Sequence, residues 1–207
     1  SPNKTKLGAN AILSVSLAVA RVQALNLKKP LYLYLNSLAK TYQINVEISL
    51  PTPVFNVING GKHGAGNLNF QEFQIIPASY KSFSQKIQIG VEIYHALKKV
   101  LVYRNAVSSV GDEGGFAPNL FTNIDALEII VEAIRNTSYS LGKDVFLGLD
   151  VAATHFKING KYQIKDQSLP FSANELITYY HDLNDKLHLL LLAYVKCQHL
   201  LILKSVM

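Results

Sequence analysis

Two adjacent carboxylates stand in the glycine-rich segment VGDEGGFAP, residues 110–118. Asp112 and Glu113 are followed at once by two glycines, whose backbone turns sharply because it tolerates positive φ. Phe116 supplies an apolar anchor and Pro118 ends any regular ladder, which predicts an ordered loop that holds an acid in a set place. Neighbouring carboxylates repel when both ionise, so one pKa rises and that carboxyl becomes suited to general acid catalysis near neutral pH. A solvated acidic turn is the alternative interpretation.

Four further polar residues stand at positions where active sites are often built. Asp150 ends the apolar stretch 145–150, and in a βα barrel the C-terminal end of a strand is where catalytic residues gather. Its oxygens suit Mg²⁺, although a helix N-cap or a loop salt bridge explains an isolated strand-end Asp equally well. His63 lies in a glycine-rich loop, where a lone histidine is more often structural or exposed. Gln71 and Glu72 alternate along a predicted strand and, taken alone, are its polar edge.

Hydrophobic periodicity and turn residues predict the elements that must position these side chains. Helices are expected over residues 6–25, 31–40, 82–104, 123–138 and 172–185, and strands over 54–58, 69–76, 145–150 and 187–192. The stiff segment 50–53, Leu-Pro-Thr-Pro, marks a domain boundary. The first two strands, joined by a loop, indicate an antiparallel start. Strand and helix alternation after residue 110 indicates parallel βα units.

Three local signals are more specific. Asn159-Gly160 is typical of a β-hairpin turn. Ser172 with Glu175 three residues later predicts a capping box at the start of a helix. The helix over 82–104 is expected to bury one apolar stripe, formed by Phe83, Ile87, Val91, Tyr94, Leu97 and Leu101.

The composition indicates a globular chain. Of its 207 residues 49% are hydrophobic and 16% charged, and a single cysteine, Cys197, favours a reducing, cytoplasmic setting. The net charge of +6 comes from scattered basic residues without a nucleic-acid motif, so it better suits an anionic small substrate than nucleic acid. The apolar stretch 7–20 is too short for a membrane span, and 187–203 is interrupted by polar residues. An opening Ser1 without an initiator Met indicates an internal piece of a longer chain.

Four long motifs occur together in this chain. They are KLGANAILSVSLAVAR at 6–21, NVINGGKHGAGNLNFQEF at 56–73, the acidic segment at 110–118, and FLGLDVAA at 146–153. In this order and spacing they resemble the enolase family from about residue 4 to 188. The resemblance implies an α/β fold: an incomplete enolase-type β/α (TIM-like) barrel, preceded by helices from the end of an α+β N-terminal domain. We therefore expect three parts, with 1–49 the helical remnant of that domain, 50–188 the first part of the barrel, and 189–207 a tail without likeness to the family.

The resemblance also implies roles for single residues. Glu113 corresponds to the proton donor of the family, and Asp150 to one of its Mg²⁺ ligands. His63, Gln71 and Glu72 correspond to residues at the substrate. The implied reaction is the reversible dehydration of 2-phosphoglycerate to phosphoenolpyruvate in glycolysis, by a cytoplasmic, commonly homodimeric lyase. Asp112, beside the proton donor, is expected to shape the loop.

The sequence also departs from the family pattern. Lys62 stands where a serine is usual. The catalytic lysine, two further acidic metal ligands, a second lysine and an Arg-Ser phosphate clamp come from later strands and have no counterpart here. A Glu-Asp-Pro-Phe stretch is expected after the strand at 187–192, but the chain runs on through Tyr194 without it. These departures predict that the chain alone is inactive. The alternative is a non-catalytic, truncated relative that acts only as a binding module.

Overall fold

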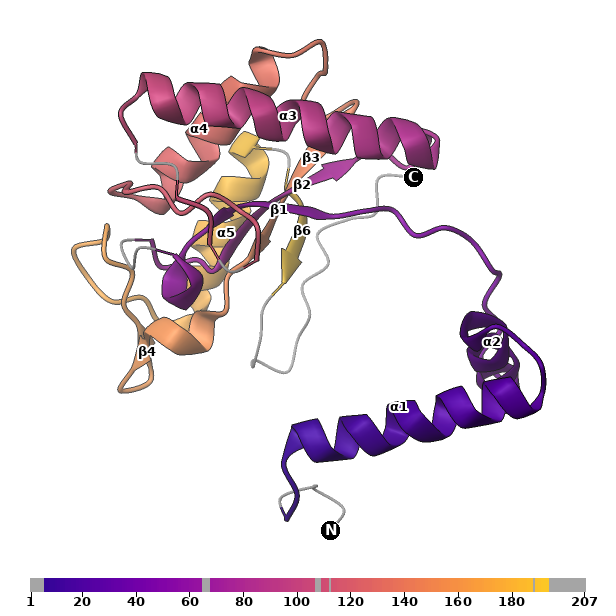
Figure 1. Cartoon of the computed structure of the whole chain (residues 1–207). Coiled ribbons are helices and arrows are strands. Elements are labelled where there is room, and N and C mark those ends of the chain that lie inside the picture. Colours follow the sequence, from indigo (N-terminus) through magenta and orange to yellow (C-terminus); the bar gives the residue numbers. More distant parts are fainter. Residues whose placement is uncertain (1–5, 65–67, 107–108, 112, 188, 194–207) are drawn as a thin grey trace. The chain divides into compact units, whose positions relative to one another are not determined.

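A computed structural model describes residues 6–64, 68–106, 109–111, 113–187 and 189–193 (Figure 1). The chain divides into two compact units, Ser1–Leu50 and Pro51–Met207. The tail from residue 194 onward and Asp112, to which the sequence assigned particular roles, lie outside the described residues.

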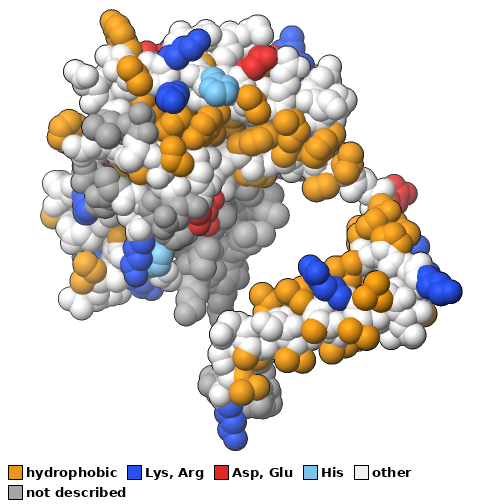
Figure 2. Space-filling view, viewed as in Figure 1, with side chains coloured by type: hydrophobic (Ala, Val, Ile, Leu, Met, Phe, Trp, Pro, Cys, Tyr) orange, Lys and Arg blue, Asp and Glu red, His pale blue; other side chains and the backbone are white. Residues whose placement is uncertain are grey.

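The first unit consists of two helices, α1 at Ala9–Asn26 and α2 at Leu31–Thr41. Alanine-rich sequence favours α1, and Pro30 sets the entry into α2 with a φ of −55°. Ala24 is the one buried residue of the two helices, and Figure 2 shows apolar side chains spread over their surface. Among the described residues no single helix is long and apolar enough to cross a membrane, and α1 with α2 meets that length only as a pair bent by 101°.

The second unit is built on a four-stranded sheet in the order β1-β2-β3-β6. Its strands are β1 at Phe55–Asn59, β2 at Glu72–Pro77, β3 at Val145–Asp150 and β6 at Leu189–Ala193. The pairs β1–β2 and β2–β3 are antiparallel, and β3–β6 is parallel. This confirms the predicted antiparallel start and the parallel βα unit. Strands β2 and β3 run in opposite directions because two helices separate them along the chain, each of which reverses its course.

Three long helices accompany the sheet: α3 at Phe83–Tyr103, α4 at Asn123–Arg135 and α5 at Ala173–Leu187. In Figure 1, α3 and α4 lie next to each other. The fold is α/β, an open barrel of four strands in the described residues, as the sequence predicted. Short 3-10 turns, η1 at Gly61–His63 and η2 at Ala153–Phe156, follow β1 and β3.

The core lies between the sheet and these helices, and it is dense in aromatic residues, with Phe70, Phe73 and Phe116 at most 2% exposed. The predicted apolar stripe of α3 is only half right. Leu97 and Leu101 are buried, but Phe83, Ile87 and Val91 are 37–48% exposed and Ile89, Ile93 and Val100 are buried in their place. Apolar residues occur on two sides of α3, so periodicity alone did not decide which side faces the sheet.

The predictions from local sequence signals were confirmed, because such signals depend only on neighbouring residues in the chain. Asn159 (φ 49°) and Gly160 (φ 80°) turn between β4 at Lys157–Ile158 and β5 at Lys161–Tyr162. At the start of α5, Glu175 N donates to Ser172 Oγ (3.3 Å) and Ser172 N to Glu175 Oε2 (2.7 Å), which is the predicted capping box.

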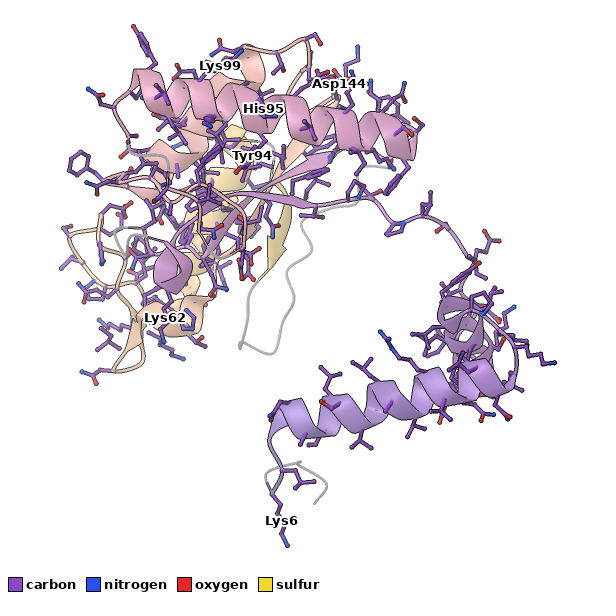
Figure 3. The ribbon with its side chains drawn as sticks, viewed as in Figure 1. Lys6, Lys62, Tyr94, His95, Lys99 and Asp144 are labelled. Carbon is purple, nitrogen blue, oxygen red and sulfur yellow. The ribbon has the colours of Figure 1, made fainter. Side chains whose placement is uncertain are left out.

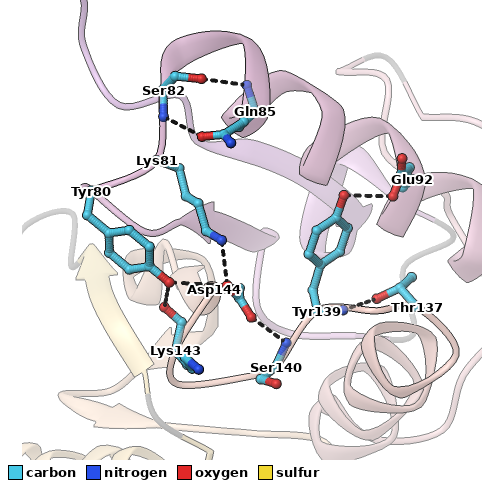
Figure 4. A network of polar contacts seen from close by, with 10 residues as sticks. All are labelled: Tyr80, Lys81, Ser82, Gln85, Glu92, Thr137, Tyr139, Ser140, Lys143 and Asp144. Atoms are coloured by element: carbon cyan, nitrogen blue, oxygen red, sulfur yellow. Dashed lines mark hydrogen bonds and ion pairs between the residues drawn. The ribbon is translucent and has the colours of Figure 1, made fainter.

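A polar network secures the end of the sheet at which β3 begins (Figure 4). Lys81 Nζ lies 2.7 Å from Asp144 Oδ1, and Tyr80 donates its hydroxyl to the same oxygen at 3.1 Å. The amide of Ser140 donates to Asp144 Oδ2 at 3.0 Å. These donors, Lys81 first and then the Ser140 amide, lower the pKa of Asp144.

Candidate active site

The acidic loop has the sharp turn that its glycines predict. Gly114 N donates to Gly111 O at 3.0 Å and Gly111 N to Gly115 O at 2.8 Å. Gly114 has a φ of +85°, in the left-handed region. A Cβ on Gly115 would stand 2.3 Å from Oδ1 of Asn59. The first glycine is therefore needed for its conformation and the second for its lack of a side chain.

The loop is attached to the edge of β1 through Phe116. The amide of Phe116 donates to Val57 O at 2.9 Å, and Asn59 N donates to Phe116 O at 2.8 Å. Its ring is only 2% exposed, which confirms it as the apolar anchor. These contacts fix the position of Glu113, three residues earlier in the chain, relative to the sheet.

Asn56 links Glu113 directly to β1. Its Nδ2 donates to Glu113 Oε2 at 3.1 Å and to Asn59 Oδ1 at 2.8 Å. Asn59 is buried, at 1% exposure. A neutral amide from β1 thus helps to hold the Glu113 carboxylate in place.

Glu72 and Asp150 are direct partners across β2 and β3. The amide of Gln71 donates to the carbonyl of Asp150 at 3.0 Å, and Gln74 Nε2 donates to Glu72 Oε2 at 2.6 Å. Asp150 Oδ1 accepts from the amide of Ala152 at 3.1 Å. Side chains from the start of β2 and the end of β3 therefore meet at one end of the sheet, where a barrel carries its active site.

The electrostatics show that Glu113 belongs to the same group. Burial raises the pKa of Glu72 above its ordinary value of 4.5, while the hydrogen bond from Gln74 opposes this. A hydrogen bond to the Glu113 carboxyl and the negative charges of Glu113 and Asp150 raise it further. The three carboxylates, far apart in sequence, thus lie close enough to influence one another.

Magnesium is the cation that carboxylate oxygens of this kind suit. In the part of the chain that the structure describes, however, no group of three or more His, Cys, Asp or Glu side chains is arranged to hold a metal ion. Asp150 is the ligand that the sequence predicts, and the side chain of His63 lies outside the described part. The described residues therefore do not make a complete magnesium site by themselves.

Asn123, which the sequence analysis overlooked, secures the approach to β2. It is 1% exposed, and its Oδ1 accepts from the amides of Asn69 (3.0 Å) and Phe70 (3.1 Å). Its own backbone N–H donates to Asp166 Oδ2 at 3.0 Å. The predicted strand at 69–76 starts only at Glu72, and the Asn69 and Phe70 amides before it bond to Asn123 instead of to a neighbouring strand.

Sheet order and strand directions define an α/β protein of the β/α-barrel class. Its candidate site, with Glu72, Glu113 and Asp150, lies at the C-terminal end of β3. Residues 47–192 match the family model described as enolase, C-terminal TIM barrel domain. The match covers more than half of the chain, and the chain belongs to the enolase family.

Proposed function

We propose that this chain supplies the proton donor of an enolase-type reaction, the dehydration of 2-phosphoglycerate to phosphoenolpyruvate. The observation that supports this most is the proximity of Glu72, Glu113 and Asp150 at one end of the sheet. Membership in a family that binds a small-molecule substrate supports it independently. The net charge of +6 favours the approach of a phosphorylated carboxylate.

Loss of water from this substrate has two difficult parts. A hydroxide is a poor leaving group, so it needs a proton as the carbon–oxygen bond breaks. Glu113 is the proposed donor, and Glu72, Gln71 and His63 are proposed to orient the substrate. Burial and then the neighbouring Glu113 and Asp150 raise the pKa of Glu72, so Glu72 keeps its proton to higher pH than an isolated carboxyl does.

The second part is removal of the carbon-bound proton next to a carboxylate, and it needs a base. The family supplies a lysine from a later barrel strand, and residues 1–207 contain no matching stretch. The family's Mg²⁺, for which Asp150 is the proposed ligand, stabilises the charge that this step develops. We propose that without base and complete metal site the chain alone does not turn over.

A turnover assay tests the claim of inactivity. The purified chain is incubated with 2-phosphoglycerate and excess Mg²⁺, and phosphoenolpyruvate is followed by its ultraviolet absorbance. We expect no product above the buffer control. Formation of phosphoenolpyruvate in proportion to chain concentration would contradict the proposal.

A binding experiment tests the site itself. Phosphoenolpyruvate with Mg²⁺ is titrated into isotope-labelled chain, and amide shifts are recorded by NMR. We expect shifts confined to the neighbourhoods of Glu72, Glu113 and Asp150, at least fivefold weaker in Glu113→Gln. Glu175→Gln, a fully exposed carboxyl at the start of α5, serves as the matched control and should bind like the wild type. Shifts centred elsewhere would refute the site.

The second candidate function is a non-catalytic binding module. The lack of a ready-made metal group in the described residues favours it. It predicts phosphoenolpyruvate binding that is independent of Mg²⁺, or no binding of this compound at all. A cytoplasmic location and the homodimer common in the family remain part of the proposal in either case.

A further inference from the structure

Helix α3 is a fixed support beside the acidic loop. Its start is closed by a capping box between Ser82 and Gln85. At Gly90 it approaches β1 so closely that a Cβ there would stand 2.5 Å from the ring of Phe55. Tyr94 follows one turn later on the same helix, and Figure 3 shows it extending from α3.

Tyr94 contacts the loop on both sides of Gly115. Its hydroxyl donates to the carbonyl of Gly114 at 2.8 Å. Its ring is stacked on that of Phe116, with 4.4 Å between centroids and 16° between planes. The two contacts hold Gly114 and Phe116, which follow Glu113 in the chain, and neither contact involves the carboxylate itself.

The hydroxyl contact has a role that ring packing does not explain. A phenylalanine would stack on Phe116 equally well, but it would not bind Gly114, the residue with positive φ at the tip of the turn. Burial raises the pKa of Tyr94, so the phenol remains a donor across the neutral range.

The loop has space to move if that bond is lost. A groove of about 440 Å³ lies between β1, α3 and the loop, and its lining includes Asn56, Tyr94, Glu113 and Gly114. A shift of Gly114 into this groove would change the position of Glu113 relative to Asn56. The position of the carboxylate therefore depends on how firmly the turn is held.

We propose that Tyr94 is a positioning residue, which fixes the turn at Gly114 from α3 and thereby holds Glu113 beside Glu72. The inference rests on the proposed function for the chemical role of Glu113 alone; the contact between Tyr94 and the loop is independent of it.

The test is Tyr94→Phe in the complete chain, which removes the hydroxyl and keeps the ring. We expect amide hydrogen exchange at Gly111 and Gly114 to accelerate roughly 5- to 10-fold, the effect of one lost hydrogen bond of about 1 kcal/mol. The carboxyl ¹³C resonance of Glu113 should broaden or split, because the side chain samples a second position.

Tyr139→Phe is the matched control, since Tyr139 donates its hydroxyl to Glu92 Oε2 at 2.7 Å, away from the loop. It should leave exchange at Gly111 and Gly114 and the Glu113 resonance unchanged. Exchange at the loop that is equal in Tyr94→Phe and wild type would overturn the proposal. Equal acceleration in the buried part of α4 would also overturn it, because Tyr94 would then serve general stability. Neither readout requires substrate or turnover, so a failed binding test leaves this inference standing and the reverse holds too.

Discussion

The two ends of β3 carry carboxylates in opposite electrostatic situations. At its beginning, Asp144 accepts from Lys81, Tyr80 and the Ser140 amide, and its pKa is lowered (Figure 4). At its end, Asp150 faces Glu72, whose pKa is raised by burial and then by neighbouring carboxylates. The contacts at the first end lower the pKa of Asp144, whereas the surroundings at the second end raise the pKa of Glu72.

We interpret this difference as one between a stabilising contact at the start of β3 and a candidate functional site at its end. A carboxylate with a cation and amide donors favours the folded state. A carboxyl whose pKa is raised by burial and by neighbouring carboxylates opposes folding when it ionises, and perturbed groups of this kind cluster at functional sites. At the end with the candidate site, neutral groups that include the amide side chains of Asn56 and Asn123 hold the loop and the approach to β2. Substitutions of those contacts should have larger effects on stability than the loss of a charge at either end.

The largest effect is expected for Gly115→Ala. Its Cβ would meet Asn59 Oδ1 at 2.3 Å and the backbone N of Ile58 at 3.2 Å, so loop and β1 edge must separate. We expect a loss of about 2 kcal/mol in the free energy of unfolding, measured by urea titration. Gly160→Ala is the comparison: Gly160 has a positive φ, unlike Gly115, but nothing lies within 4 Å of its Cβ position, so only the backbone cost of about 1 kcal/mol is expected. Equal losses would show that close packing at Asn59 is unimportant.

Asn123→Ala should have the next largest effect on the free energy of unfolding. It leaves the buried amide of Phe70 without its acceptor, which destabilises the fold by about 2 kcal/mol. Amide exchange at Asn69 and Phe70 should accelerate most. Asn174→Ala, at an exposed position of α5, should change stability by less than about 0.5 kcal/mol. If the two variants behave alike, Asn123 does not hold the approach to β2.

The smallest changes in the free energy of unfolding are expected for substitutions of Asp144 and Glu72. The two changes should have opposite signs. Asp144→Asn should lower stability at neutral pH by about 1 kcal/mol. Because the folded pKa of Asp144 is lowered, its contribution is present above the ordinary value of 3.8 and is lost as pH falls through the folded pKa. In Asp144→Asn the stability profile should accordingly flatten below pH 3.8.

Glu72→Gln should have the opposite effect on stability at neutral pH. Because the folded pKa of Glu72 is raised, folding is favoured below 4.5 and stability falls as pH rises from there through the folded pKa. Removal of this charge should raise stability at neutral pH by about 0.5 kcal/mol, a small value because solvent screens a half-buried carboxyl. Urea titrations at several pH values measure both variants. A loss of stability at neutral pH in both would contradict the contrast between the ends.

Local chemistry made part of the fold predictable. The strand at Val145–Asp150, the Asn159-Gly160 hairpin and the Ser172–Glu175 capping box each depend on residues near in sequence. The turn at Gly114 and Gly115 follows from the same kind of local rule. The enolase resemblance added the expectation that Glu72, Glu113 and Asp150 belong to one site, which local patterns do not contain.

Contacts between distant residues remained beyond such rules. The bond from Asn56 to Glu113 spans 57 residues, that from Phe70 to Asn123 spans 53, and that from Tyr94 to Gly114 spans 20. A polar side chain that satisfies a distant backbone group has no periodic signature in the sequence. For α3, apolar residues on two sides left the buried face undetermined by pattern.

The central claim is that three separate carboxylates share one electrostatic environment. A carboxyl ¹³C titration of Glu72 tests it most directly, in the wild type and in Glu113→Gln and Asp150→Asn, with Glu175→Gln as control. The account predicts a Glu72 pKa above 4.5 in the wild type that falls towards this value in the first two variants and is unchanged in the third. A Glu72 titration that is identical in all four chains would contradict it.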